Sequence, residues 1–362
     1  MDKPIVGISI GDINGIGLEV ILKTLANPQI LNLCVPVVYG SSKVVSYHKN
    51  IVGVDFPFQV VQRADRLALD RVNILNCWQE SVNITLGKAT EVGGQYAFKS
   101  LEAAARDLKQ GLVEALVTAP IHKEAMKMIG FPFPGHTEYL TQELGAEESL
   151  MFMIADDLRV GLVTNHLPVK EVAAHVSKER VLRKIRILEK SLRIDFGIDR
   201  PTIAVLSLNP HAGDGGVIGD EDERIVRPAV VECKKNGIIV TGPFPADGFF
   251  GSGAYKKYDA ILAMYHDQGL IPFKLLAFGG GVNFTAGLSG VRTSPDHGTA
   301  FEIAGKNEAD PDSFREALFA AIDIARNRKI YHDDRAHALK KRTKIAVERE
   351  DDDLDELLEE EE

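Results

Sequence analysis

Short apolar runs alternate with amphipathic stretches along almost the whole sequence, and this alternation constrains the fold more than any other feature. The runs have the length of buried strands and are rich in Val, Ile and Leu, and the expected strands are residues 5–10, 35–39, 115–118, 150–154, 159–164, 202–208, 238–241 and 259–264. Helical spacing begins near residue 19 and continues over residues 94–110, 177–192, 221–235 and 313–326. This order predicts an α/β fold in which helices cover the faces of a sheet.

The sequence has no internal repeat and no linker rich in Pro or Ser that would separate sequential domains. Its 362 residues are enough for one large α/β unit or for two lobes between which the chain crosses. We expect residues 1–345 to form a single unit of two interleaved α/β lobes. Residues 346–362 are mostly acidic, and we expect them to be a disordered tail because blocks of like charge repel one another.

Composition excludes several classes of protein. The formal net charge is -10, and much of it lies in the acidic tail, so no basic surface for nucleic acid is expected. No run of about 18 apolar residues is present, which argues against a membrane span, and the first residues lack the long apolar region of a signal peptide. The three cysteines have no CxxC spacing, and Cys34 and Cys233 lie in apolar stretches where we expect buried thiols. A cytoplasmic protein without disulfides is predicted.

Three histidines follow apolar strands in the same way. His166, His211 and His266 each come directly after an expected strand, where ligands bind in open α/β sheets. Three imidazoles with an open position would form a catalytic metal site, although a single histidine at a strand end is more often a hydrogen-bonded polar group. Asp247 and Asp267 follow similar runs, and we consider them for proton transfer or ligand orientation, with ordinary turn formation as the alternative.

Two further segments have the chemistry of anion binding. His136 and Thr137 follow a glycine where a helix is expected to begin, and backbone N–H groups at a helix start can bind phosphate or carboxylate. Helix capping by Thr137 is the simpler alternative. Lys274, Asn283 and Arg292 lie in a stretch rich in Gly and polar residues, in which we expect residues 278–285 to be a flexible loop followed by an extended segment. Such loops are usually functional in compact domains, whereas exposed surface charges are the alternative.

Two nucleotide-binding motifs are absent. The first glycine-rich turn reads GDINGIG, which does not match the GxGxxG fingerprint of a Rossmann dinucleotide site, and no GxxxxGK[ST] loop occurs. The residues alone therefore indicate an α/β protein with a metal site and anion-binding loops. They leave the reaction and any cofactor-binding residues open.

Six motifs in order carry a resemblance to a known family. They are TAPIHK (residues 118–123), PGHTE (134–138), NPHAG (209–213), GPFPAD (242–247), MYHDQG (264–269) and RTSPDHGTA (292–300). Together they resemble the 4-hydroxythreonine-4-phosphate dehydrogenase family of vitamin B6 biosynthesis, from about Pro4 to Arg328. The sequence differs in GDINGIGLE, where the family usually has GDPAGIGPE, and at Gly248, where Thr is common.

The resemblance implies a two-lobed fold like those of isocitrate and isopropylmalate dehydrogenases, with the active site in the cleft between the lobes. It implies NAD, or NADP, as cofactor, one divalent metal (zinc, magnesium or cobalt), and a homodimer with active sites shared across the interface. The family's residues carry over to eight positions. The metal ligands are His166, His211 and His266, and the substrate-binding residues are His136, Thr137, Lys274, Asn283 and Arg292.

The implied reaction is oxidation of 4-hydroxy-L-threonine 4-phosphate at C3. The product, 2-amino-3-oxo-4-phosphooxybutanoate, is a β-keto acid that loses carbon dioxide to give 3-amino-2-oxopropyl phosphate. Asp247 and Asp267 are the candidates for proton transfer, and Lys123 is another. One alternative is a dehydrogenase of a phosphorylated sugar acid such as phosphothreonate or phosphoerythronate. Another is a binding protein that keeps the fold without catalysis, which measurement of metal content would distinguish.

Overall fold

The computed structural model describes residues 3–277 and 279–337, so the predicted tail at residues 346–362 lies outside the described residues. Within those ranges the strands form one sheet of twelve. In spatial order they are β3 (Phe58–Val61), β4 (Val72–Asn76), β2 (Val35–Gly40), β1 (Ile5–Ser9), β5 (Ala115–Thr118), β12 (Val291–Pro295), β11 (Val282–Ala286), β6 (Leu150–Ala155), β7 (Leu158–Leu162), β10 (Ala260–Ala263), β8 (Thr202–Leu206) and β9 (Ile239–Phe244). The mixed α/β fold predicted from the sequence is confirmed.

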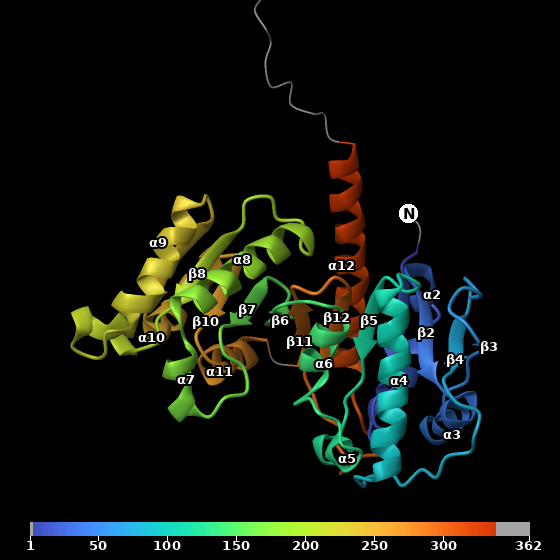
Figure 1. The fold of residues 1–362 in the computed structure, drawn as a ribbon. Helices are drawn as coiled ribbons and strands as arrows, with labels where there is room; N and C mark the ends of the chain where they lie inside the picture. Colours follow the sequence, from blue (N-terminus) through green and yellow to red (C-terminus); the bar gives the residue numbers. More distant parts are fainter. Residues whose placement is uncertain (1–2, 278, 338–362) are drawn as a thin grey trace, which may run out of the picture.

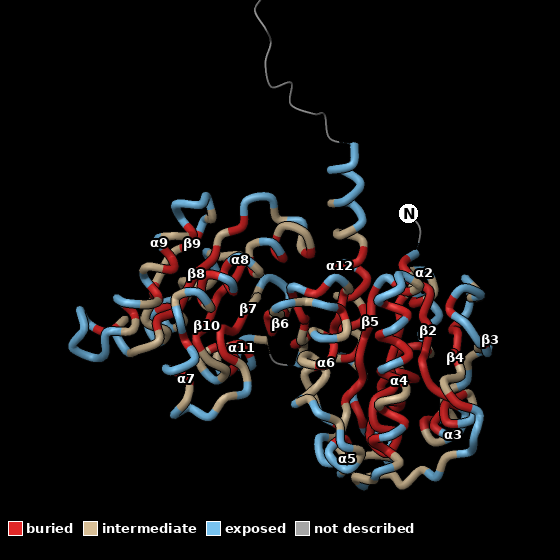
Figure 2. The backbone as a smooth tube through the Cα atoms, in the orientation of Figure 1, coloured by how far each residue is buried: buried red, intermediate tan, exposed pale blue. Residues whose placement is uncertain are grey.

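Helices cover both lobes of this sheet (Figure 1). They are α1 (Gly17–Leu25), α2 (Ile30–Leu33), α3 (Ser42–Val52), α4 (Glu91–Lys109), α5 (Lys123–Met128), α6 (His136–Glu143), α7 (Val169–His175), α8 (Lys178–Ile194), α9 (Arg227–Lys235), α10 (Ala246–Gly251), α11 (His266–Leu276) and α12 (Asp312–Ala336). Figure 2 shows buried strands in both lobes, whereas the last turns of α12 are exposed.

The chain crosses between the lobes and later returns (Figure 1). β1 to β5 belong to the first lobe and β6 to β10 to the second, and β12 then comes back to pair in parallel with β5. In the second lobe β10 lies between β7 and β8 and is parallel to both. The carboxyl ends of these three strands therefore share one edge of the sheet.

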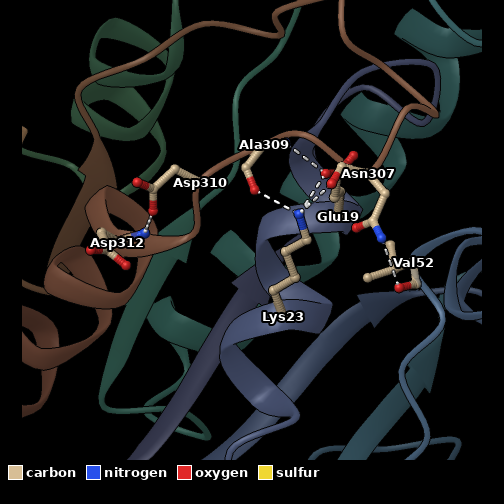
Figure 3. Close-up of polar contacts among 7 residues, drawn as sticks. All are labelled: Glu19, Lys23, Val52, Asn307, Ala309, Asp310 and Asp312. Atoms are coloured by element: carbon tan, nitrogen blue, oxygen red, sulfur yellow. Dashed lines mark hydrogen bonds and ion pairs between the residues drawn. The ribbon is translucent and has the colours of Figure 1, made fainter.

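The returning chain is fixed to α1 by a partly buried ion pair (Figure 3). Lys23 Nζ lies 2.9 Å from Glu19 Oε1 and donates to the carbonyl of Ala309 at 2.7 Å, while the Ala309 N–H donates to the same Glu19 oxygen at 2.8 Å. The Asn307 side chain adds a bond to the carbonyl of Val52. These contacts join residues 307–309 to α1 and to the end of α3, and so attach the returning chain to the first lobe.

Several local predictions agree with the structure. The strand at residues 115–118 has the predicted bounds. The strands expected at residues 150–154 and 159–164 correspond to the antiparallel pair β6 and β7, although β7 ends at Leu162. Ser177 Oγ accepts a hydrogen bond from the N–H of Arg180 and so caps α8. Cys34 and Cys233 are buried free thiols.

Other local predictions are wrong. Residues 282–285, expected in a flexible loop, belong to strand β11, and Arg292 lies in the following strand β12. Their sequences, VNFTA and VRTSP, carry polar side chains that turn inward and remove the apolar run expected of a buried strand. Asp247 does not end a strand: β9 ends at Phe244, and Asp247 lies in the first turn of α10, which Pro245 precedes.

Acid should destabilise the fold through His48. This ring is 3% exposed, its Nε2 lies 3.1 Å from the carbonyl oxygen of Ile13, and burial lowers its pKa to about 4. The unfolded chain binds a proton near pH 6.5 and the folded chain does not, so the free energy of unfolding falls as pH drops below 6.5. The loss reaches about 3 kcal/mol near pH 4.

We expect His48→Gln to flatten this dependence of unfolding free energy on pH in denaturant titrations at pH 7, 6 and 5. The same slope in His48→Gln as in the wild type would contradict the assignment, and His175→Gln, at an exposed position, is the control.

No helix among the described residues is both long and apolar enough to cross a membrane.

Candidate active site

Arg292 is the centre of a buried polar cluster. It is 2% exposed and donates hydrogen bonds to the hydroxyls of Thr118 (2.8 and 3.2 Å), Thr285 (3.0 Å) and Thr137 (3.4 Å). Burial lowers the pKa of Arg292 to about 10, and the Glu138 carboxylate opposes this shift. Among the described residues no carboxylate forms an ion pair with Arg292. A buried positive charge that meets only hydroxyl groups favours an anionic ligand.

Register on the sheet explains how this cluster forms. Thr293 pairs with Phe284 across the antiparallel strands β12 and β11, which places Arg292 opposite Thr285. Asn283 lies two residues before Thr285 and therefore points to the same face of the sheet. Its side-chain oxygen is buried, and among the described residues it has no hydrogen-bond partner.

His136 adds an imidazole to this cluster. It is the first residue of α6, with Gly135 at the N-cap, so the helix begins one residue earlier than predicted. Burial and the nearby Arg292 guanidinium lower the pKa of His136 well below its usual value. Its Nε2 is buried without a hydrogen-bond partner in the described part of the chain. Four of the five predicted substrate-binding residues, His136, Thr137, Asn283 and Arg292, are thus brought to one place.

Lys274 does not join this cluster. Its ammonium lies 3.0 Å from Asp296 Oδ2, near the end of α11, and its side chain is 54% exposed. The ion pair with Asp296 is on the surface and contributes about 1 kcal/mol or less. A ligand could therefore draw Lys274 away from Asp296 at little cost.

His166 and His266 lie together at the shared edge of β7 and β10. Their ring centroids are 5.5 Å apart, and His266 Nδ1 lies 2.7 Å from Asp267 Oδ1. Burial lowers the pKa of His166, and the charges of Lys123 and His266 lower it further, while Glu138 opposes them. His166 is therefore neutral near pH 7, the form that binds metal ions.

His211 lies apart from this pair, on a neighbouring cavity. It is exposed, in the segment Pro210–Gly216 after β8, and it lines a cavity of about 570 Å³. Asp247 and Asp267 line the same cavity. The structure brings two of the three predicted ligands together, and Asp267 connects the pair with the cavity that His211 borders.

The His166 and His266 pair has the chemistry of a divalent metal site. Two imidazoles are adjacent, and a carboxylate on the other ring nitrogen of His266 is the partner that orients metal-binding histidines. Within the described residues, however, no group of three or more His, Cys, Asp or Glu side chains is arranged to hold a metal. Imidazole and carboxylate donors fit a transition metal. In the described part of one chain, the two adjacent histidines therefore lack a third ligand beside them.

Sequence reasoning missed three residues of the cluster. Thr118 and Thr285 bind the Arg292 guanidinium, and Glu138 lies close enough to influence both Arg292 and His166. Thr118 is the last residue of a buried strand, which is the signal that could have indicated it. The Thr285 and Glu138 positions depend on register and helix docking, which local sequence does not encode.

Comparison with known proteins identifies relatives along most of the chain. Residues 32–321 match the family model described as pyridoxal phosphate biosynthetic protein PdxA. A 4-hydroxythreonine-4-phosphate dehydrogenase of Bacteroides thetaiotaomicron is 49% identical over 337 residues, which cover 93% of each chain. A putative D-threonate 4-phosphate dehydrogenase of Oceanobacillus iheyensis is 38% identical, covering 89% of this chain and 98% of the relative.

Solved structures give the same relationship. The crystal structure of 4-hydroxythreonine-4-phosphate dehydrogenase from Klebsiella pneumoniae superposes with a TM-score of 0.80 at 34% identity, covering 89% of this chain and all of that one. The order of the motifs, the α/β fold and these matches lead to one conclusion: the chain belongs to the PdxA family of pyridoxal phosphate biosynthetic proteins.

Proposed function

We propose that this protein catalyses the NAD-dependent oxidation of 4-hydroxy-L-threonine 4-phosphate at C3, followed by loss of carbon dioxide to give 3-amino-2-oxopropyl phosphate. NAD, or NADP, is the oxidant that this class of reaction requires. The proposal is supported most by the buried Arg292 guanidinium, whose hydrogen-bond partners among the described residues are threonine hydroxyls. The His166 and His266 imidazoles support it further, because Glu138 acts on both His166 and Arg292. A phosphorylated hydroxy acid has both groups that such a site would bind.

The phosphate is proposed to bind at the start of α6. Arg292 supplies charge and a planar pair of donors suited to phosphate. Thr137 and the backbone N–H groups of the first turn add neutral donors. His136 Nε2 is buried without a partner among the described residues and, as its N–H tautomer, would donate to the phosphate. The Asn283 side-chain oxygen also has no partner there, and it would accept from a donor group of the substrate. Lys274 would complete the phosphate-binding residues by leaving its ion pair with Asp296 and pairing with the phosphate.

His166, His211 and His266 are the proposed metal ligands, with zinc, magnesium or cobalt as the ion. When bound, such an ion lowers the pKa of a hydroxyl and stabilises the alkoxide. Asp267 orients the His266 ring through its bond to Nδ1. Asp247, exposed on the neighbouring cavity, remains a candidate for proton transfer to solvent.

A second copy of the chain is proposed to cover α11. This helix exposes Ile271 (59%), Leu275 (77%) and Leu276 (48%), which lie beside Lys274 and share the helix with His266. Contiguous apolar side chains at the surface mark interaction sites. Covering this face would form a homodimer and place each copy beside the other's incomplete metal site.

We expect Leu275→Glu to weaken dimerisation at least about 100-fold, because it places an unpaired charge in an apolar interface. Sedimentation velocity over a concentration series measures this. Val231→Glu changes an exposed apolar residue on α9 and is the control. An unchanged dimer in Leu275→Glu would exclude α11 from the interface.

The purified protein, mixed with 4-hydroxy-L-threonine 4-phosphate, NAD and a divalent metal, tests the proposed reaction. We expect NADH absorbance to rise and to stop rising when a chelator is added. NADH formation that continues in the presence of the chelator would contradict the metal dependence of the reaction. If no phosphorylated hydroxy acid gives NADH, the proposed catalysis is wrong and the protein is a binding protein with this fold.

A further inference from the structure

The segment that carries His211 has an uncommon backbone. His211, Ala212, Gly213, Asp214 and Gly215 have φ values of 54, 54, 80, 44 and 63°, so five consecutive residues are left-handed. Three of them are not glycine, and each side chain then crowds its own backbone. Left-handed runs persist only where the surroundings determine them, and they concentrate at functional sites. Some neighbouring group must therefore hold this segment.

Asp222 holds the residues that lead into this segment. Its carboxylate is completely buried, and its two oxygens accept the N–H groups of Leu208 (2.7 Å) and Asn209 (2.9 Å). These are the two residues before Pro210 and His211. Among the described residues no Lys or Arg forms an ion pair with Asp222. Arg227, whose pKa is raised by Glu223 and then by Asp222, lies nearby but makes no ion pair with Asp222. The buried carboxylate therefore relies on these two N–H donors, and the geometry is strongly determined.

Two further contacts limit the movement of the segment. Asn209 Nδ2 donates to Glu221 Oε2 at 2.7 Å. A Cβ atom on Gly213 would lie 2.6 Å from the carbonyl oxygen of Gly219, so the left-handed turn packs directly against the chain that leads to Asp222. The segment is therefore held against residues 219–221, which lead directly to Asp222.

A half-buried side chain, that of Gln268, relates this segment to His266. Gln268 Nε2 donates to the carbonyl of Ser207 at 2.6 Å, and Gln268 Oε1 accepts the N–H of Met264 at 2.7 Å. Gln268 thus joins the strand end before His211 to the strand end before His266. Asp222 binds the next two residues along, Leu208 and Asn209, and so acts on the chain between Ser207 and His211.

We propose that Asp222 is a positioning residue: it fixes the backbone of Leu208 and Asn209 and thereby holds the His211 imidazole ready for a metal. The proposal rests on the proposed function, in which His211 is a ligand. Its consequence is that metal affinity depends on a carboxylate that touches neither metal nor substrate.

Asp222→Asn in the full-length protein tests the proposal, because the amide keeps the shape but presents an N–H to one of the two backbone donors. With Co²⁺ alone as the probe, we expect affinity to fall about 10- to 100-fold, the range for residues that orient metal ligands. Hydrogen exchange in the metal-free protein should be faster at Leu208 and Asn209. Asp222→Ser is measured in parallel, so that the result does not depend on the folding of one variant. Serine is smaller than aspartate and leaves room for a water that can accept from the backbone N–H groups.

Asp195→Asn is the matched control. Asp195 is also a buried carboxylate, paired with Ser191 and Arg328, and lies outside the site. We expect it to lower the melting temperature without changing Co²⁺ affinity. If Asp222→Asn behaves in the same way, Asp222 has only a structural role and the proposal is overturned. If His211→Ala retains wild-type Co²⁺ affinity, the ligand assignment in the proposed function fails, and the positioning role fails with it.

Discussion

Arg292→Met should abolish substrate binding while leaving the fold nearly as stable as the wild type. The guanidinium is buried with three hydroxyl partners and forms no ion pair among the described residues, although Glu138 is near enough to favour its charge. Its desolvation is therefore only partly compensated until an anion binds. Methionine fills a similar volume. The variant avoids the free-energy cost of burying a charge, and this gain offsets the loss of the hydrogen bonds to the threonines. We expect the free energy of unfolding to change by less than about 2 kcal/mol. Calorimetric titration with 4-hydroxy-L-threonine 4-phosphate should show a Kd raised at least about 100-fold.

Arg328→Met is the control for this prediction, and its expected result is the reverse. Arg328 Nε lies 2.6 Å from a carboxylate oxygen of Asp195, which is 3% exposed. Removing the arginine leaves that buried charge unpaired, which costs about 3–5 kcal/mol of stability. Substrate affinity should not change. Substrate affinity retained in Arg292→Met would mean that the phosphate binds elsewhere.

His166→Ala should remove the bound divalent metal and reduce NADH formation at least about 1,000-fold. One of the three proposed ligands is lost, and a site that needs three imidazoles is left with His266 and the separately placed His211. Metal content of the purified variant and steady-state rates with added Co²⁺ measure the two effects separately.

His175→Ala changes an exposed histidine on α7, whose Nδ1 contacts only the carbonyl of Glu171. It should keep both metal and activity. Full metal content in His166→Ala would contradict the assignment of this residue, whatever its effect on the rate.

The parts of the fold predicted from sequence are those with a strong local signal. Strand β5 is wholly apolar up to Thr118, and α8 has a capping serine and an apolar stripe, so local chemistry determines both. Strands β11 and β12 have no such signal. Several of their polar residues are buried, and partners from other segments satisfy them: Arg292 donates to Thr118, and Thr293 donates to the carbonyl of Ala317.

The candidate site shows the same division. Histidines at strand ends are visible in sequence, and the parallel pairing of β7 with β10 brings His166 and His266 together. The separate place of His211 depends on a left-handed turn held by Asp222, fourteen residues from Leu208. No local pattern predicts that turn, because its conformation is set by a tertiary contact.

The most direct measurement is the ratio of kcat/KM for 4-hydroxy-L-threonine 4-phosphate to kcat/KM for D-threonate 4-phosphate, with NAD and Co²⁺. The two differ in the group at C2, amino in one and hydroxyl in the other, and relatives named for each are 49% and 38% identical to this chain. The proposed function predicts a ratio of at least about 100, corresponding to about 2.7 kcal/mol. A ratio below one would assign the protein to phosphorylated sugar acids.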